Sequence, residues 1–415
     1  MDFTAYFTAG KTLNNNLNPY VNYVQSRWDL WDGFASFKHS RFLYPPLVAV
    51  MFQPIASVSY INAKYIWNFF NLTCFLVSIL ILLKITGLYH NLNKSLISLI
   101  LAFNFFPFIA LLERGQVDCL TLLLILCGFA LNGKSKKNDF FAGLLFGFAS
   151  LFKLYTLLII PFLFLNKKYR VLYGYLTGIV LIVILTFSLC GTQLTKQYAE
   201  KEFNRIAKFG SGGTSEMQIP VWILQSYFPM TPTSISMIDG RMYLSESISF
   251  NSKASFVRLA EVIFDKTPFK IPNSIISGFV FLLLFAFIYY YDKKYNFTEK
   301  ITNNLIYLQA ILIIITLSSP YTWVMNLIWL LPVAFILTDK FEWFISEKKY
   351  LYLLLLIAGF LLIALPDNLL LTKNVPIVSE IFKVRFILGQ IIILIFLVLM
   401  TKVFFTKFSI EDKEI

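Results

Sequence analysis

The sequence predicts a helical bundle that crosses a lipid bilayer about eleven times. Of its 415 residues, 57% are hydrophobic and only 14% are charged, and the mean hydropathy is +0.68. A soluble domain carries about 25% charged residues, so water is not the main solvent of this chain. Apolar runs long enough to span the hydrocarbon core recur along the sequence. We therefore predict an all-α polytopic membrane protein with a single transmembrane domain over residues 1–415.

The predicted spans are apolar runs whose composition fits a membrane helix. They are 63–84, 95–112, 116–132, 138–152, 155–166, 170–190, 272–291, 301–318, 321–338, 350–366 and 386–405. The two short runs on either side of Lys153 are expected to be tilted or broken helices. A further run at 45–59 begins with two prolines and contains Pro54, which predicts a juxtamembrane or re-entrant helix.

Basic residues gather in every second loop, which predicts the orientation of the bundle. The clusters are Lys134/Lys136/Lys137, Lys167/Lys168/Arg170, Lys293/Lys294, Lys340/Lys348/Lys349 and Lys402/Lys407. With these in the cytoplasm, residues 1–44 form a first external loop and 191–271 a long external loop. The net charge of +13 belongs to these clusters, which argues against a nucleic-acid partner. We expect a multi-pass protein of the plasma (inner) membrane.

The N-terminus shows no sign of a cleavable signal peptide, because Asp2 and a polar segment follow Met1 at once. If residues 1–44 lie outside, another segment has to carry them across the bilayer. We therefore expect a further helix to be encoded upstream of Met1.

Polar and ionisable side chains converge on the predicted outer face. Such groups are costly at membrane depth and are therefore candidates for function. The candidates are Asp2, Tyr44, Glu113, Arg114, Gln116, Asp118, Lys153, Trp323, Asn326 and Arg385.

Several candidates also have a purely structural interpretation. Asp2 fits a solvated terminal acid, Glu113 and Arg114 fit a charge pair that anchors helix ends, and Trp323 fits an interfacial belt. Lys153 is harder to explain in this way. A lysine can extend its ammonium to the interface, but the loop around Lys153 is nearly absent, so we expect an anionic partner.

The motifs of soluble enzymes are missing. The sequence contains no Walker loop, no dinucleotide-binding glycine fingerprint in a strand–helix context, no HExxH and no Asp-x-Asp pair. Its two histidines, His39 and His90, are far apart. We therefore expect no metal and no cofactor, and a metal-dependent nucleotide-sugar transferase is disfavoured. The glycine-rich stretch 210–215 has no preceding strand and predicts a flexible external loop.

The order of these motifs resembles glycosyltransferase family 87. The motifs are Asp2 before an external loop, Asn18-Pro19-Tyr20, Tyr44-Pro45-Pro46, Gly115-Gln116-Val117-Asp118, the lone Lys153 and Ser319-Pro320-Tyr321-Thr322-Trp323. The resemblance extends from Asp2 to about Asn326, and the final helices match in hydropathy only. The chain departs from the family at Asp118, where asparagine is usual, and after Trp323, where a histidine often follows. The missing first helix is a further departure.

The resemblance implies a C-type glycosyltransferase fold and transfer of a sugar, mannose in this family, from a polyprenyl-phosphate donor. The acceptor would be a lipid or a glycan on the non-cytoplasmic face. Asp2 would be the general base and Lys153 would hold the donor phosphate.

Elementary chemistry extends this assignment to the other candidates. Arg114 or Arg385 would share the charge of the departing phosphate. The remaining candidates would contact the sugar, the prenyl chain or the acceptor: Tyr44, Glu113, Gln116, Asp118, Gln218 with the 210–215 loop, Trp323 and Asn326.

Two other classes of protein remain open. A polytopic transporter or lipid-linked-sugar flippase also gathers charges in a bundle, but transporters often contain inverted repeats. The sequence shows no convincing internal repeat, and its polar groups lie on one face, which favours an enzyme. A non-catalytic membrane scaffold would explain the hydropathy but would leave Lys153 and the Glu113–Arg114 pair unaccounted for.

Overall fold

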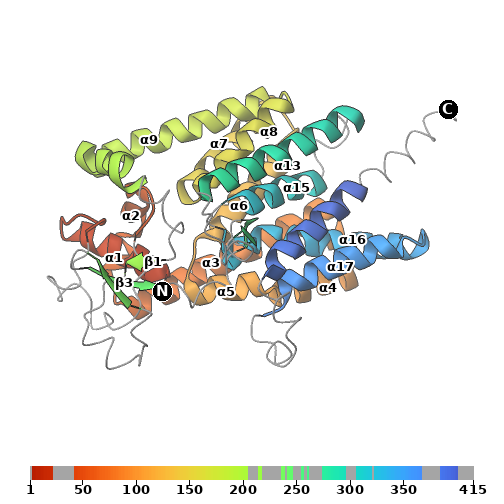
Figure 1. Ribbon diagram of the computed structural model, residues 1–415, viewed down its shortest axis with the longest axis horizontal. Coiled ribbons are helices and arrows are strands. Elements are labelled where there is room, and N and C mark those ends of the chain that lie inside the picture. The colour runs from red at the N-terminus through yellow and green to blue at the C-terminus, as the bar shows by residue number, and fades with distance from the viewer. Residues whose placement is uncertain are drawn as a thin grey trace.

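The computed structural model describes residues 2–21, 42–203, 214–216, 235–238, 241–245, 254–256, 259–260, 273–295, 305–319, 322–366 and 384–400. Within these residues the chain is dominated by helices, several of which run along the long axis of the molecule (Figure 1). From the N-terminus to the end of the first half they are α1 (Asp2–Asn14), α2 (Pro46–Phe52), η2 (Ile55–Ser57), α3 (Tyr60–Thr86), η3 (Leu88–His90), α4 (Leu92–Phe103), α5 (Phe106–Arg114), α6 (Asp118–Leu131), α7 (Lys136–Phe152), η4 (Leu154–Leu158), α8 (Ile159–Leu165), α9 (Tyr169–Gln197) and η5 (Tyr198–Glu202). They continue with α13 (Asn273–Tyr295), α15 (Leu305–Ser318), η8 (Val324–Leu330), α16 (Pro332–Ser346), α17 (Tyr350–Ala364) and a last helix over Val384–Met400.

Two of the described helices, Tyr60–Thr86 and Tyr169–Glu202, are long and apolar enough to cross a membrane. The number rises to four if each of two bent helix pairs forms one span. Six further apolar helices have only 10–17 residues, short of the ~20 residues that a crossing usually needs. The structure is therefore consistent with a helical membrane protein, but the predicted number of spans is not confirmed.

The bent pairs coincide with two of the predicted spans and have local causes. α4 and α5 meet at 48°, where Phe105 is extended and Pro107 lies in the first turn of α5. η8 and α16 meet at 41°, and Pro332 is the first residue of α16. Proline is favoured at a helix start because its missing N–H costs nothing there. Each proline therefore starts a new helix in a new direction.

The predicted first external loop contains a helix, α1, over its described N-terminal part. Phe3, Tyr6 and Phe7 are fully buried and lie at the spacing of one helix face. Their rings contact Phe52 and Tyr60. This aromatic packing fixes α1 on the segment that contains α2 and the start of α3.

α7 and α9 pack backbone against backbone through small residues. A Cβ atom at Gly143 would lie 1.9 Å from the carbonyl oxygen of Val171, and one at Gly174 would lie 2.0 Å from that of Phe140. Gly147 and Gly178 continue the same contact one turn further along. Glycine at four-residue spacing lets membrane helices approach this closely.

Gly143→Ala is expected to lower the free energy of unfolding by about 1–3 kcal/mol, because α7 and α9 would have to separate to admit the methyl group. Thermal unfolding of the purified protein in detergent would measure the change. Gly278→Ala in α13 is the matched control, since a Cβ atom there meets nothing within 4 Å. A melting temperature for Gly143→Ala equal to that of the control would contradict the contact.

A small antiparallel sheet lies within the predicted long external loop. It consists of β1 (Thr214–Glu216), β2 (Ile235–Ile238) and β3 (Arg241–Ser245) in the order β1-β3-β2. β2 and β3 flank Asp239-Gly240, a dipeptide typical of a two-residue hairpin turn. The prediction of an all-α fold was therefore incomplete, because it did not include this small sheet.

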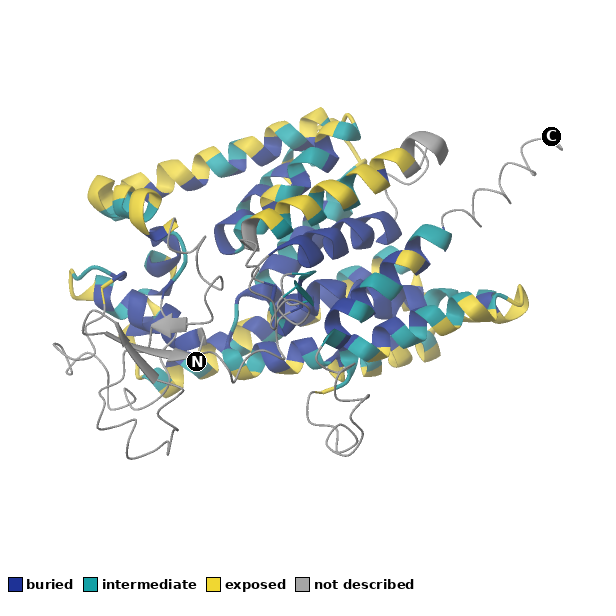
Figure 2. Cartoon of the chain, viewed as in Figure 1, coloured by how far each residue is buried: buried dark blue, intermediate teal, exposed yellow. Residues whose placement is uncertain are grey.

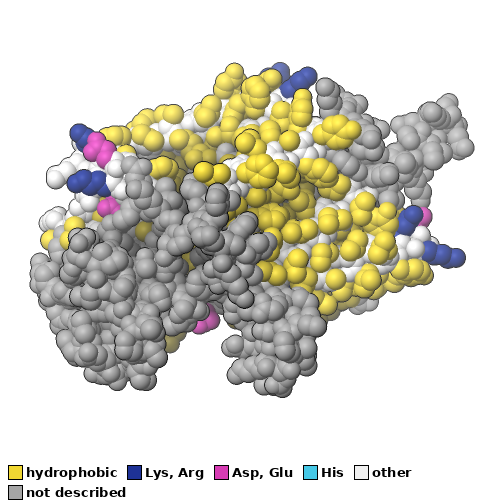
Figure 3. Space-filling view, in the orientation of Figure 1, with side chains coloured by type: hydrophobic (Ala, Val, Ile, Leu, Met, Phe, Trp, Pro, Cys, Tyr) yellow, Lys and Arg dark blue, Asp and Glu magenta, His cyan; other side chains and the backbone are white. Residues whose placement is uncertain are grey.

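The core lies among the central helices, and the outer helices expose apolar side chains. Every residue of α15 is buried, whereas α9 and α13 show many exposed positions (Figure 2). Large hydrophobic side chains such as Val180, Ile184 and Phe279 are about half exposed or more. In Figure 3, hydrophobic side chains cover the middle of the visible face, and the described charged ones lie toward its edges. An apolar belt of this kind is expected of a surface in contact with lipid.

Candidate active site

Two opposite charges meet in the interior, at the ends of two helices. The Nζ atom of Lys153 lies 3.1 Å from Oδ2 of Asp118, and the exposed fractions of the two side chains are 10% and 0%. Asp118 is the first residue of α6, where the helix dipole favours an anion. Lys153 follows the last residue of α7 in an extended conformation, before η4 begins. Lys153 therefore has a buried carboxylate as its anionic partner.

Asn326 holds the same carboxylate from another part of the chain. Its Nδ2 atom donates to Oδ1 of Asp118 at 2.8 Å. Its own Oδ1 accepts from the backbone N–H of Trp323, also at 2.8 Å, and so caps η8. Both oxygens of Asp118 are thus engaged, one by a cation and one by an amide. This chain of contacts ties η8, α6 and the end of α7 together.

A second group of polar side chains consists of two tyrosines and a glutamine. The hydroxyl of Tyr6 lies 2.6 Å from the hydroxyl of Tyr44 and 2.8 Å from Oε1 of Gln116. The hydroxyl of Tyr44 lies 3.2 Å from the same oxygen. The backbone carbonyl of Tyr44 accepts a hydrogen bond from Tyr20 at 2.7 Å. Three separate segments, α1, the stretch before α2 and the turn after α5, thus converge.

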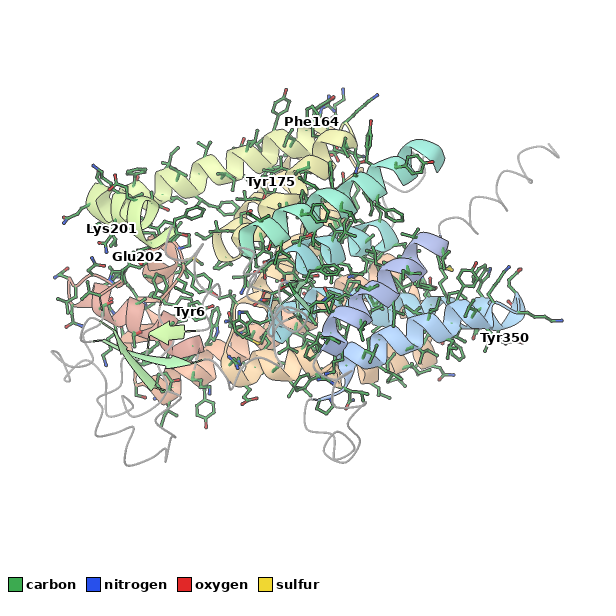
Figure 4. The ribbon with its side chains drawn as sticks, viewed as in Figure 1. Tyr6, Phe164, Tyr175, Lys201, Glu202 and Tyr350 are labelled. Carbon is green, nitrogen blue, oxygen red and sulfur yellow. The ribbon has the colours of Figure 1, made fainter. Side chains whose placement is uncertain are left out.

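The two groups meet at Lys153. Its Nζ atom lies 5.9 Å from the ring centroid of Tyr44, within the range of a cation–π contact. We call the combined set the polar junction; it consists of Tyr6, Tyr44, Gln116, Asp118, Lys153 and Asn326. In Figure 4, Tyr6 lies toward the end of the molecule that carries Lys201 and Glu202, away from Phe164 and Tyr350.

Gly115 shapes the turn that serves both halves of the junction. Its φ of 71° and ψ of 42° are left-handed, a conformation that glycine adopts without steric cost. A Cβ atom there would lie 2.7 Å from Cβ of Phe3. Its carbonyl accepts a hydrogen bond from Nε1 of Trp67 at 2.8 Å. The turn is therefore fixed by packing. It places Gln116 beside the two tyrosines and Asp118 beside Lys153.

Four predicted residues at the edge of the junction are placed less directly. Asp2 begins α1, one helical turn before Tyr6, and its side chain lies outside the described residues. Glu113 is exposed and Arg114 half-buried in the last turn of α5. Trp323 is half-buried, and its backbone N–H donates the hydrogen bond to Oδ1 of Asn326.

Arg385 lies in another part of the fold, and Gln218 with most of the 210–215 loop lies outside the described residues. Arg385 is fully buried, with its guanidinium 4.3 Å from the ring centroid of Phe386 and 5.8 Å from that of Phe106. Phe106 begins α5, so it is separated from Arg114 by roughly 12 Å of helix rise. Gln218 and residues 210–213 lie outside the described residues, whereas Thr214 begins β1.

Tyr6 is a member of the junction that the sequence did not single out. The signal was the spacing of Asp2 and Tyr6, which share a helix face only if residues 2–14 are helical. Within the described part of the chain, no three His, Cys, Asp or Glu side chains form a group that could hold a metal ion.

The chemistry available at the junction is that of anion and hydroxyl binding. An ammonium carries three N–H groups; among the described residues one of them points to Asp118, which leaves two for a ligand. Phenol hydroxyls and an amide can exchange hydrogen bonds with the hydroxyls of a sugar. The site thus combines a buried cation with neutral polar groups beside it.

Comparisons with known proteins support one family. No curated protein and no solved structure matches the chain significantly. The model of glycosyltransferase family 87 matches residues 42–228. This range contains Tyr44, Gln116, Asp118 and Lys153, and the match indicates a glycosyltransferase. The resemblance to glycosyltransferase family 87 is thereby confirmed over residues 42–228, the part of the chain that the family model matches.

Proposed function

We propose that this protein moves a sugar, in the first instance mannose, from a polyprenyl-phosphate donor to a lipid or glycan acceptor on the non-cytoplasmic face of the plasma membrane. The family match supports the transferase class. The observation that carries the choice of donor is the buried ammonium of Lys153. A cation in a site of low dielectric constant favours an anionic group strongly, and the phosphate of such a donor supplies one.

Lys153 is the proposed ligand of the donor phosphate, and Asp118 is its positioning residue. Lys153 and Asn326 each hold one oxygen of Asp118, so the main proposed role of this carboxylate is to orient Lys153. Aspartate, where the family usually has asparagine, gives the ammonium a full counter-charge in the absence of substrate. Arg114, half-buried at the end of α5, is the proposed second cation, with Arg385 as the alternative.

The sugar is proposed to contact Tyr6, Tyr44 and Gln116, whose polar groups gather next to Lys153. Phenol rings also offer apolar faces for the ring of a sugar or for a prenyl chain. Glu113, which is exposed, and Gln218 are proposed to face the acceptor. Trp323 and Asn326 complete the site by holding η8 against Asp118.

The reaction is proposed as a single inverting displacement. Asp2 removes the proton of the acceptor hydroxyl while the acceptor oxygen attacks the anomeric carbon from the face opposite the phosphate. The bond between that carbon and the phosphate oxygen breaks, and polyprenyl phosphate leaves with the electron pair. General-base catalysis of this kind contributes roughly 10²–10⁴-fold. Lys153 stabilises the charge that develops on the phosphate.

The proposed side of the membrane is supported by the arrangement of the molecule. Phe164 and Tyr350 lie close in sequence to the basic clusters Lys167/Lys168 and Lys348/Lys349, which the positive-inside rule assigns to the cytoplasm. Tyr6 lies away from both in Figure 4. The junction would therefore lie toward the opposite face.

Transfer of radiolabelled mannose from polyprenyl-phosphate-mannose to membrane lipids and glycans tests the proposal. Membranes containing the protein are expected to transfer the label, and membranes without it are not. A parallel reaction with polyprenyl-phosphate-glucose reports the sugar preference. If the inserted protein transfers no sugar from either donor but moves the intact donor across a vesicle bilayer, it is a flippase and the proposal is wrong.

A further inference from the structure

Two buried hydrogen-bond donors near Lys153 make no hydrogen bond to any described residue. One is the hydroxyl of Tyr155 in η4, two residues after Lys153; the other is Nε1 of Trp329 in η8, a fully buried side chain. The two rings are in contact, with centroids 5.1 Å apart. Tyr155 also interacts electrostatically with both Lys153 and Asp118. Tyr155 therefore borders the polar junction, and Trp329 packs against it from η8.

Buried polar groups in proteins nearly always have a partner, so a pair of unsatisfied donors calls for an explanation. The nearby carboxylate of Asp118 holds the ion pair with Lys153 and the hydrogen bond from Asn326, and neither of the two donors is bonded to it. An indole N–H can only donate, and an ammonium has no acceptor at all. What the hydroxyl of Tyr155 and the indole N–H of Trp329 lack is a bonded acceptor, and the charge of Lys153 favours an anionic one.

Other buried amides without described partners do not point to an anion in this way. Asn71 and Gln309 leave both an amide nitrogen and an amide oxygen unsatisfied. A group that offers donor and acceptor together suits water or a second amide. The group formed by Lys153, Trp329 and Tyr155 differs because it combines a cation, an indole N–H and a phenol O–H.

We propose that Tyr155 and Trp329 bind the phosphate oxygens of the prenyl-phosphate ligand together with Lys153. This inference rests on the proposed function and names two residues that its donor site had not included. A phosphate offers only acceptors and a negative charge. It therefore complements the ammonium, the hydroxyl and the indole N–H of these three residues. The same donors serve the product of transfer, polyprenyl phosphate, whose charge is greater than that of the sugar-linked donor.

The test measures binding of polyprenyl phosphate, with uncharged polyprenol of the same length as reference, to the full-length protein in detergent. Tyr155→Phe keeps the ring contact with Trp329 and removes only the hydroxyl. Its Kd for polyprenyl phosphate is expected to rise about ten- to hundredfold, the effect of one hydrogen bond to a charged group. Its Kd for polyprenol should stay unchanged. Trp329→Phe is expected to act in the same direction.

The melting temperature without ligand separates binding from folding. Tyr155→Phe removes an unsatisfied buried hydroxyl and is expected to melt at the wild-type temperature or above. The matched control is Tyr175→Phe, because the hydroxyl of Tyr175 is buried and bonded to Ser150. That control should melt earlier and should bind polyprenyl phosphate as the wild type does.

Each alternative outcome contradicts a different statement. If the wild type binds polyprenyl phosphate more tightly than polyprenol and Tyr155→Phe has the same Kd, the assignment of Tyr155 is wrong and the donor class stands. A lower ligand-free melting temperature with an unchanged Kd shows a structural role and overturns the assignment as well. If the wild type does not distinguish the two lipids, no phosphate site exists and the proposed function falls with it.

Discussion

Asp118→Asn is expected to lower the free energy of unfolding by about 3–5 kcal/mol, because it leaves the ammonium of Lys153 buried without a counter-charge. Asparagine keeps the size of the side chain and can still accept the hydrogen bond from Asn326. The loss therefore reports the charge and not a cavity. Denaturant or thermal unfolding of the purified protein in detergent would measure it. An Asp118→Asn protein as stable as the wild type would contradict the buried ion pair.

The double variant Asp118→Asn/Lys153→Met separates folding from donor binding. Lys153→Met alone leaves the carboxylate of Asp118 buried and unpaired, so it is expected to be destabilised as well. Removing both charges should recover most of the stability, since a buried ion pair can often be replaced by neutral groups. The folded double variant should nevertheless fail to bind polyprenyl-phosphate-mannose. Retained donor affinity would exclude Lys153 as the phosphate ligand.

An exposed ion pair in the same chain is the control for this comparison. Lys94 and Glu342 lie 2.6 Å apart, with exposed side-chain fractions of 21% and 74%. Glu342→Gln is expected to change the stability by no more than about 1 kcal/mol, because solvent screens such pairs. A large loss there would show that the assay responds to any charge removal.

Asp2→Asn is expected to lower the rate of sugar transfer by roughly 10²–10⁴-fold while donor binding is retained. The amide cannot accept the proton of the acceptor hydroxyl, but it leaves α1 and Tyr6 in place. The measurement is the turnover of radiolabelled mannose transfer at saturating donor. Asn15→Ala, an exposed change just after the other end of α1, is expected to be fully active.

Transfer that survives Asp2→Asn would move the general base to another carboxylate. Glu113 would then be the first candidate, because it is exposed at the end of α5. Asp118 is a poor second, since Lys153 and Asn326 engage both of its oxygens. The class of reaction would remain as proposed, and only the base would change.

Hydropathy predicted the helical character of the chain well, because each apolar run is a local property. Most predicted spans coincide with a helix or a bent helix pair. The number of crossings could not be predicted in the same way, since helices such as α6 and α15 are apolar but short. Whether a short helix is buried in protein or faces lipid depends on its neighbours, which a single sequence does not show.

The candidate site was predictable in its residue types and less so in its pairings. The cost of a lysine at membrane depth indicated an anionic partner for Lys153, but the choice of Asp118 depends on how α6 packs against α7. Tyr6 was not among the predicted site residues, because α1 is stabilised by aromatic packing and contains no long apolar run. The hairpin at β2 and β3 did have a local signal, the Asp-Gly dipeptide between the strands.

The turn around Gly115 has a consequence for how two ligands would influence each other. It supplies Gln116 to the tyrosine hydroxyls and, two residues later, Asp118 to the buried lysine. A ligand that shifts this turn from one side alters the geometry offered on the other. Thermodynamic linkage makes such an influence equal in both directions. A free sugar beside Gln116 and polyprenyl phosphate beside Lys153, offered as separate ligands, are then expected to change each other's affinity by the same factor, with this turn as the element that connects them.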